Sequence, residues 1–285
     1  MRFGLALSGG ATRGVAHIGA MKALEEEGLV PSWISGTSAG SIVAALYACG
    51  VGVREMEKIA LTLDKRIYDT DYKGIIWGIL QWILTWDTTW DGIVKGKYLQ
   101  NLIKDLTGGK WIRESKLPLA ITAVDINTAQ TVIFVNNKRM IKDDDDILYI
   151  DNVPIYQAVR ASIAIPVIFK PVIIQGMRLV DGGVTVSVPT QVLRNMGAEK
   201  VMGINLGYSG QRRSDVNNIL EIGSQTIDIM SYKIMKSTTH KADIIINPHI
   251  YDVGMLDMHR IPEMIERGYR AVKDSIVSIK RVMNR

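Results

Sequence analysis

The chain carries Gly36-Thr37-Ser38-Ala39-Gly40, a G-x-S-x-G pattern, between a short apolar strand and a helix rich in small residues. A serine in such a strand–turn–helix context occupies a tight turn that exposes its hydroxyl. Each glycine leaves room for the strand or helix beside it, where a side chain would collide. The following helix directs its positive end at the serine, which favours negative charge there. The pattern makes Ser38 a candidate nucleophile, with Gly36 and Gly40 as the glycines of its turn.

The same pattern has a plain structural alternative. A turn of small residues also packs a helix onto a sheet, and so short a motif is weak evidence by itself. Chemistry at Ser38 therefore needs support from other parts of the chain.

A glycine-rich loop at residues 8–14 reads Ser-Gly-Gly-Ala-Thr-Arg-Gly, between an apolar segment and a predicted helix over residues 15–27. Successive N–H groups in such a loop form a nest that binds anions, and the helix start behind it adds to the field. A serine hydrolase needs such a nest as its oxyanion hole. The residues expected to form it are Gly9, Gly10, Ala11, Thr12 and Arg13.

The loop also has a second interpretation, as a dinucleotide-binding fingerprint. Its spacing is Gly9-x-Ala11-x-x-Gly14, with alanine in place of the second glycine. The acidic residues Glu25–Glu27 come too early for a ribose ligand and lie inside the predicted helix. A nucleotide-dependent oxidoreductase stays open as an alternative that this spacing disfavours.

A third motif, Asp181-Gly182-Gly183, follows a predicted strand at residues 177–180. A carboxylate at a strand end, followed by glycines, can approach another backbone closely, although an ordinary Asp-Gly turn reads the same way. The chain's histidines have no neighbours diagnostic of a Ser-His-Asp triad; they are His17, His240, His249 and His259. Asp181 remains as a direct base, which requires a desolvated site because an ordinary carboxyl pKa lies near 4.

Strands alternate with helices along the chain, which predicts an α/β fold with a largely parallel sheet. Long amphipathic helices are expected over residues 219–236 and 261–282, and residues 167–174 are expected to be extended. The 285 residues carry a net charge of +5 without a dense basic block, which does not favour nucleic acid as a partner. A single cysteine excludes an intramolecular disulfide, and no run of 18 apolar residues exists that would span a membrane.

Taken together, the motifs resemble those of the patatin-like phospholipases. The resemblance rests on the glycine loop at residues 9–14, on residues 36–40 and on residues 181–183. Neighbouring stretches at 16–20, 158–162 and 184–189 resemble bacterial members as well. It covers about residues 3–208, and no motif can be placed in residues 209–285.

The resemblance implies a single three-layer α/β/α domain over residues 1–285, with a C-terminal helical extension from about residue 209. It implies a Ser-Asp dyad with Ser38 as nucleophile and Asp181 as general base, and no metal or cofactor. The substrates would be acyl esters of phospholipids, lysophospholipids or neutral lipids. The family usually has a third glycine where this chain has Ala11, and alanine disfavours a positive φ. A lipid-binding protein with little or no turnover is therefore the alternative function.

Four tryptophans gather between residues 66 and 96, and this segment is a candidate for contact with a membrane surface or an acyl-chain entrance. Packing of the aromatic side chains against each other is the competing interpretation. Oligomerisation through this segment is a further alternative. We expect a cytoplasmic protein, and the candidate residues for peripheral contact with the inner face of the membrane are Trp77, Trp82, Trp86 and Trp90.

Overall fold

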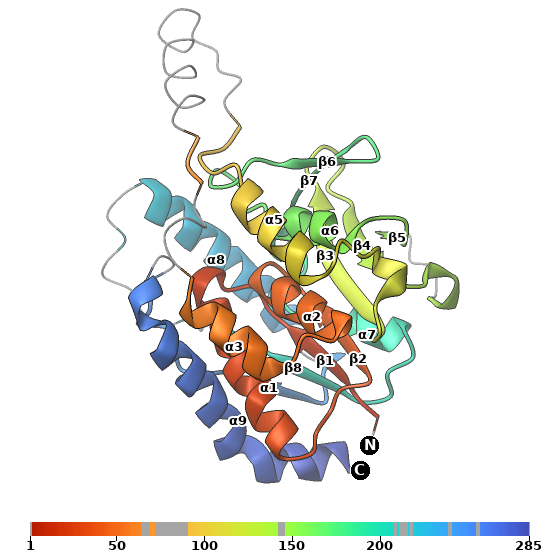
Figure 1. The fold of residues 1–285 in the computed structure, drawn as a ribbon, viewed down its shortest axis with the longest axis vertical. Helices are drawn as coiled ribbons and strands as arrows, with labels where there is room; N and C mark the ends of the chain where they lie inside the picture. The colour runs from red at the N-terminus through yellow and green to blue at the C-terminus, as the bar shows by residue number, and fades with distance from the viewer. Residues whose placement is uncertain are drawn as a thin grey trace, which may run out of the picture.

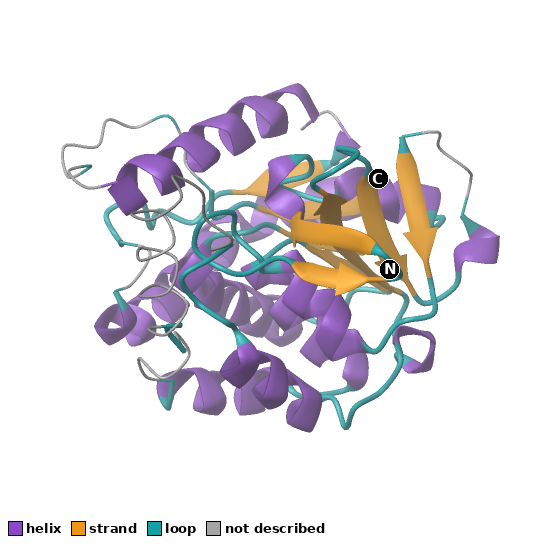
Figure 2. Ribbon diagram, turned by 90° about the horizontal axis from the view of Figure 1, so that it is seen from above, coloured by secondary structure: helices purple, strands orange, loops and turns teal. Residues whose placement is uncertain are grey.

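The computed structural model describes residues 2–63, 69–71, 91–141, 146–207, 210, 216, 219–238, 241–254 and 257–284. Within them a mostly parallel sheet lies between layers of helices (Figures 1 and 2). The strands are β1 (Gly4–Leu7), β2 (Trp33–Gly36), β3 (Leu119–Asp125), β4 (Thr131–Val135), β5 (Ile147–Ile150), β6 (Val172–Ile174), β7 (Met177–Asp181), β8 (Val201–Ile204) and β9 (Ile244–Ile246). The helices are α1 (Ala16–Glu26), α2 (Ala39–Cys49), α3 (Val53–Leu61), α5 (Lys97–Leu106), α6 (Ile155–Ser162), α7 (Thr190–Asn195), α8 (Ile219–Thr238) and α9 (Ile261–Met283).

The sheet has the strand order β5-β4-β3-β2-β1-β8-β9, and β7 pairs with both β3 and β6. In the sheet order β3-β2-β1-β8-β9, each strand is parallel to its neighbours. Strands β4 and β7 each lie antiparallel to β3. Every residue of β1 and of β3 is buried, as a parallel sheet covered on both faces requires. Since parallel strands end on one edge, the turns after β1 and β2 lie side by side. The predicted α/β fold with a largely parallel sheet is confirmed.

The side chains on the two faces of strand β1 pack into two different cores. Leu5 and Leu7 point into the main core with α1, α2 and α9, whereas Ala6 points into a second core with Leu193 of α7. Side chains alternate between the faces of a strand, so these two cores lie on opposite sides of the sheet. The three-layer arrangement is therefore also confirmed.

Helices α1 and α9 cross at backbone contact. A Cβ added to Gly19 would lie 1.8 Å from the carbonyl oxygen of Ile265, and one added to Gly268 would lie 2.0 Å from that of Ala16. Neither position has room for a side chain while the helices stay together. This crossing ties the C-terminal helix to the helix that follows the glycine loop.

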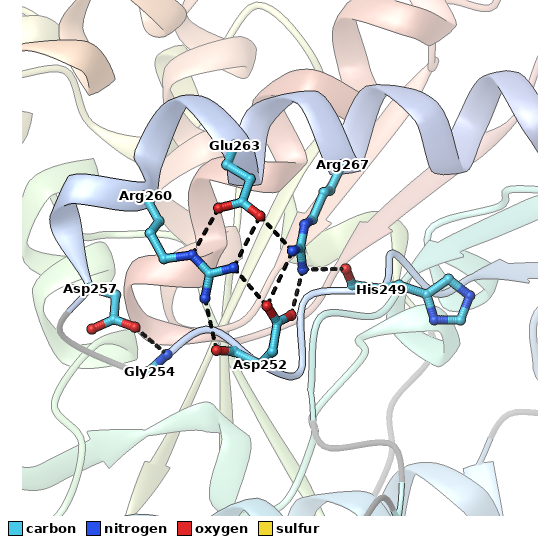
Figure 3. Close-up of polar contacts among 7 residues, drawn as sticks. All are labelled: His249, Asp252, Gly254, Asp257, Arg260, Glu263 and Arg267. Carbon is cyan, nitrogen blue, oxygen red and sulfur yellow. Dashed lines mark hydrogen bonds and ion pairs between the residues drawn. The ribbon is translucent and has the colours of Figure 1, made fainter.

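An ion network fixes the segment that leads into α9 (Figure 3). Arg260 contacts Asp252 at 2.6 Å and Glu263 at 2.8 Å, and Arg267 contacts the same two carboxylates. The guanidinium groups hold the pKa of Asp252 well below its usual range. Farther along, Lys273 pairs with Glu27 of the α1 end. These basic groups of α9 are engaged within the molecule.

Some expectations fail in detail. The segment 167–174 was expected to be extended, but only Val172–Ile174 is a strand, and Val167 lies in a turn with a φ of 70°. Strand β5 and helix α7 were not predicted, since each is short and follows no clear periodicity. Trp77, Trp82, Trp86 and Trp90, the candidates for membrane contact, lie outside the described residues. Among those that are described, no helix has the length and apolarity to cross a membrane.

The α1–α9 crossing predicts that Gly19→Ala strongly destabilises the protein. The added methyl must push Ile265 away, and we expect the free energy of unfolding to fall by about 3 kcal/mol. Urea denaturation measures this. Gly223→Ala in α8 is the matched control, because its Cβ would meet nothing within 4 Å. There the gain in helix propensity of up to about 1 kcal/mol should dominate. A Gly19→Ala variant as stable as the control would contradict the crossing.

Candidate active site

Ser38 sits in a strained turn between β2 and α2. Its φ of 52° and ψ of −127° are unfavourable for a residue with a side chain. A Cβ on Gly36 would lie 2.4 Å from the carbonyl oxygen of Gly40, and one on Gly40 would lie 2.4 Å from that of Leu7. The chain can make this turn only with glycine at both positions, as the sequence pattern predicted.

Buried hydrogen bonds hold the strained turn in place. The Ser38 N–H donates to Ser162 Oγ at 2.9 Å, and Ser41 Oγ donates to the Ser38 carbonyl at 2.6 Å. The Thr37 hydroxyl donates to the Val186 carbonyl at 2.9 Å and contacts Thr122 Oγ1 at 2.8 Å. These partners come from α6, β3 and the segment after β7. The stretches at 158–162 and 184–189 resemble family members, but the sequence did not indicate that Ser162 or Thr122 contacts the Ser38 turn.

Asp181 ends β7 and reaches the same place. Its carboxylate is buried, and Oδ1 accepts a hydrogen bond of 2.7 Å from the Gly183 N–H. Burial raises its pKa from the usual value to about 6, while hydrogen bonds with the Ser38 side chain and the Gly183 N–H lower it, and the charge of Asp228 raises it. The carboxyl is therefore a stronger base than an exposed aspartate and remains mostly ionised at pH 7.

The glycine loop lines the space in front of Ser38. A Cβ added to Gly9 would lie 3.1 Å from Ser38 Cβ. Ala11 adopts a φ of 50°, the left-handed conformation that alanine disfavours, so the loop keeps the shape expected of a glycine there. The Arg13 N–H donates to the Gly10 carbonyl at 3.1 Å, whereas no hydrogen bond from the N–H of Gly9 or Gly10 is found among the described residues.

Arg13 is itself buried and paired. Its Nη2 lies 3.1 Å from Asp228 Oδ2 on α8, and its Nε donates to the Gly10 carbonyl at 3.3 Å. One turn along α8, Ser231 Oγ donates to the Gly183 carbonyl at 2.9 Å. Helix α8 is thus attached to the glycine loop and to the Asp181 turn. No motif in residues 219–238 indicated that this helix lies over the site.

These elements line a partly open cavity of about 60 Å³, which is room for several water molecules. Its lining includes Gly9, Gly10, Ala11, Arg13, Ser38, Ile165, Pro166, Asp181, Asp228 and Ser231. Ser38, Asp181 and the glycine loop, predicted from three separate motifs, therefore meet at one cavity. Thr12 lies in the loop but is absent from the lining.

The described histidines do not line this cavity. His17 is buried behind the loop, and the His249 ring points away from the ion network at the start of α9 (Figure 3). In the part of the chain that the structure describes, no cluster of three or more His, Cys, Asp or Glu residues is able to hold a metal ion.

Comparison with known proteins agrees with the motifs. A sequence model described as Patatin-like phospholipase matches residues 5–194, which include the glycine loop, Ser38 and Asp181. An NTE family protein of Mycobacterium tuberculosis is 28% identical over 208 residues, covering 73% of this chain and 50% of the relative. Lysophospholipase NTE1 of Scheffersomyces stipitis is 25% identical over 216 residues, covering 73% of this chain and 12% of that protein. The chain thus spans half, or less, of the length of these curated relatives.

The fold has counterparts among solved structures. VipD from Legionella pneumophila superposes with a TM-score of 0.53 at 15% identity, covering 97% of this chain and 67% of that chain. At this identity the likeness concerns the fold alone. The family model covers well over half of the residues and contains all three motifs. The chain belongs to the patatin-like phospholipase family.

Proposed function

We propose that the protein hydrolyses acyl esters of lipids, with Ser38 as the nucleophile and Asp181 as the general base. The observation that carries this proposal is the meeting of three features at one cavity: a serine on a strained turn, a buried carboxyl whose pKa the Ser38 side chain lowers, and a loop in which the N–H groups of Gly9 and Gly10 have no partner among the described residues. Acyl transfer requires a nucleophile, a base and a stabiliser of negative charge.

In the first step, Ser38 Oγ attacks the ester carbonyl carbon while its proton passes to the Asp181 carboxylate. The carbonyl oxygen becomes negatively charged and accepts hydrogen bonds from the N–H groups of Gly9 and Gly10. When the tetrahedral intermediate collapses, the C–O bond to the alcohol breaks. Asp181 then returns the proton to the leaving oxygen.

In the second step, water takes the place of the alcohol. Asp181 accepts a proton from the water as its oxygen attacks the acyl carbon, and the bond to Ser38 Oγ breaks as the proton returns to Ser38. One ester and one water become one alcohol and one carboxylic acid, and the protein is unchanged. A pKa near 6 suits a carboxyl that must take and return a proton near neutral pH.

A lipid substrate is supported by the family and by one relative. The family is that of the patatin-like phospholipases, and a relative is named as a lysophospholipase. We also propose that residues 1–285 act as one domain, because α8 lines the cavity and α9 packs on α1 although both follow the part that the family model matches.

The dyad predicts that Ser38→Ala and Asp181→Asn each lower hydrolysis of p-nitrophenyl butyrate at least a thousandfold, because each loses a group needed in both steps. A fluorophosphonate should label only those proteins that keep both Ser38 and Asp181. Ser278→Ala and Asp274→Asn, the same changes at exposed positions of α9, serve as matched controls with wild-type rates. A wild type that neither turns over nor labels, with lipid vesicles present, would favour the lipid-binding alternative.

The raised pKa of Asp181 predicts how activity depends on pH. Only the ionised carboxyl accepts the Ser38 proton, so kcat/KM should be constant above about pH 7 and fall tenfold per unit below a midpoint near 6. An unperturbed aspartate would place that midpoint near 4. A rate profile from pH 4.5 to 8, with stability checked at each pH, measures it. Constant activity down to pH 5 would contradict the raised pKa of Asp181.

The hydrogen bonds around Ser38 predict that Ser162→Ala destabilises the protein more than Ser41→Ala does. Ser162→Ala leaves the buried Ser38 N–H without an acceptor, and we expect a loss of about 1–3 kcal/mol in the free energy of unfolding with a lower kcat. Ser41→Ala removes a hydroxyl from the Ser38 carbonyl, which still accepts a backbone bond of 2.8 Å from the Ser41 N–H. That variant should lose less than half as much. Denaturation and rate measurements on both variants decide, and equal losses would argue against a special role of Ser162.

A further inference from the structure

His17 is a buried group that the two steps above do not use. It lies in the first turn of α1, fully buried, with Nε2 2.8 Å from the carbonyl oxygen of Ser8. A carbonyl only accepts, so Nε2 carries the proton. Burial lowers the pKa of His17 to about 4, so the ring is neutral at pH 7.

A histidine at position 17 lowers the stability of the fold because of its other ring nitrogen. Nδ1 is then a bare acceptor, and it is buried with no hydrogen-bond partner in the described structure. A buried unsatisfied polar atom costs on the order of 1–3 kcal/mol. A hydrocarbon side chain would fill the same space without that cost. The feature that a hydrocarbon would lack is the bond to the Ser8 carbonyl.

That bond fixes the direction of a neighbouring N–H. The Ser8–Gly9 peptide is planar and trans, so its carbonyl and the Gly9 N–H point in opposite directions. With the carbonyl held toward α1, the Gly9 N–H points away from α1. Gly9 lines the cavity against Ser38, and its N–H has no partner among the described residues.

The next two peptides of the loop are held in the same way. Ser8 Oγ donates to the Gly9 carbonyl at 2.8 Å, and Arg13 donates to the Gly10 carbonyl from its backbone N at 3.1 Å and from Nε at 3.3 Å. Three successive carbonyls thus each have a donor, and the N–H groups that follow them are turned to the other side. His17 supplies the donor for the first peptide, which is the one beside the nucleophile.

We propose that His17 is a positioning residue of this hydrolase: its Nε2–H holds the Ser8 carbonyl and thereby aims the Gly9 N–H at the oxygen that becomes negatively charged. This role rests on the proposed function. His17 exchanges no proton with the substrate and acts through the loop alone.

Two amide substitutions separate this role from simple packing. In His17→Gln the amide nitrogen lies as far along the side chain as Nε2 and can donate to Ser8. In His17→Asn it lies at the place of Nδ1 and falls short of Ser8. We expect His17→Gln to keep kcat within about threefold of the wild type. His17→Asn should lose about tenfold to a hundredfold in kcat, with KM changed less than about twofold, since one misaimed oxyanion donor acts only in the transition state. If His17→Asn does not fold, His17→Leu provides the variant without a donor.

A measurement without turnover completes the test. In ¹⁵N-labelled protein, the Gly9 amide resonance should stay near its wild-type position in His17→Gln and move in His17→Asn or His17→Leu. Equal kcat losses in the Gln and Asn variants, a loss confined to KM, or an unmoved Gly9 resonance would each overturn the proposal. If the wild type itself shows no hydrolysis, the proposed function fails, and the Gly9 resonance alone decides whether His17 holds this peptide.

Discussion

The site depends on one steric constraint, the approach of three backbone segments to within contact where β1 and β2 end. A side chain at Gly40 would meet the Leu7 carbonyl, one at Gly36 would meet the Gly40 carbonyl, and one at Gly14 would lie 2.4 Å from Ala39 Cβ. The glycine loop, the Ser38 turn and the start of α2 therefore share one rigid arrangement. Close packing of this kind transmits any shift directly, so a methyl group at one of these glycines displaces the nucleophile and the loop together.

This constraint explains why so much of the site could be predicted from the sequence. Glycines that let two backbone segments approach closely must stand at fixed positions. Gly36, Gly40 and the glycines of the loop at residues 8–14 therefore form a pattern that can be recognised in the sequence. The alternation of apolar strands and amphipathic helices likewise indicated the parallel sheet, and the end of β7 placed Asp181. Ala11 shows a limit of such rules: the loop imposes a positive φ on an alanine, and the surrounding packing sustains it.

Other parts of the site left no pattern because they arise from contacts between distant segments. Ser162 lies in a stretch that resembles family members, but its role, like that of Thr122, comes from lying against the Ser38 turn. Helix α8 reads as one more amphipathic helix, and nothing in its sequence indicates that Asp228 meets a buried Arg13. The short elements β5 and α7 carry too few residues for a period to emerge, and the apolar run from Val167 suggested a strand where a turn forms.

The crossing of α1 and α9 has a consequence for the time at which the site is completed. A ribosome releases the glycine loop, α1 and the Ser38 turn early, whereas α9 follows all the described strands of the sheet along the chain. Until α9 docks at Gly19 and Gly268, the main-core side of α1 stays uncovered, and α1 is the helix from which His17 reaches the loop. A growing chain therefore carries the Ser38 turn before the helix that bears His17 is packed against α9. On the function proposed above, the anion-binding loop is completed only when α9 docks.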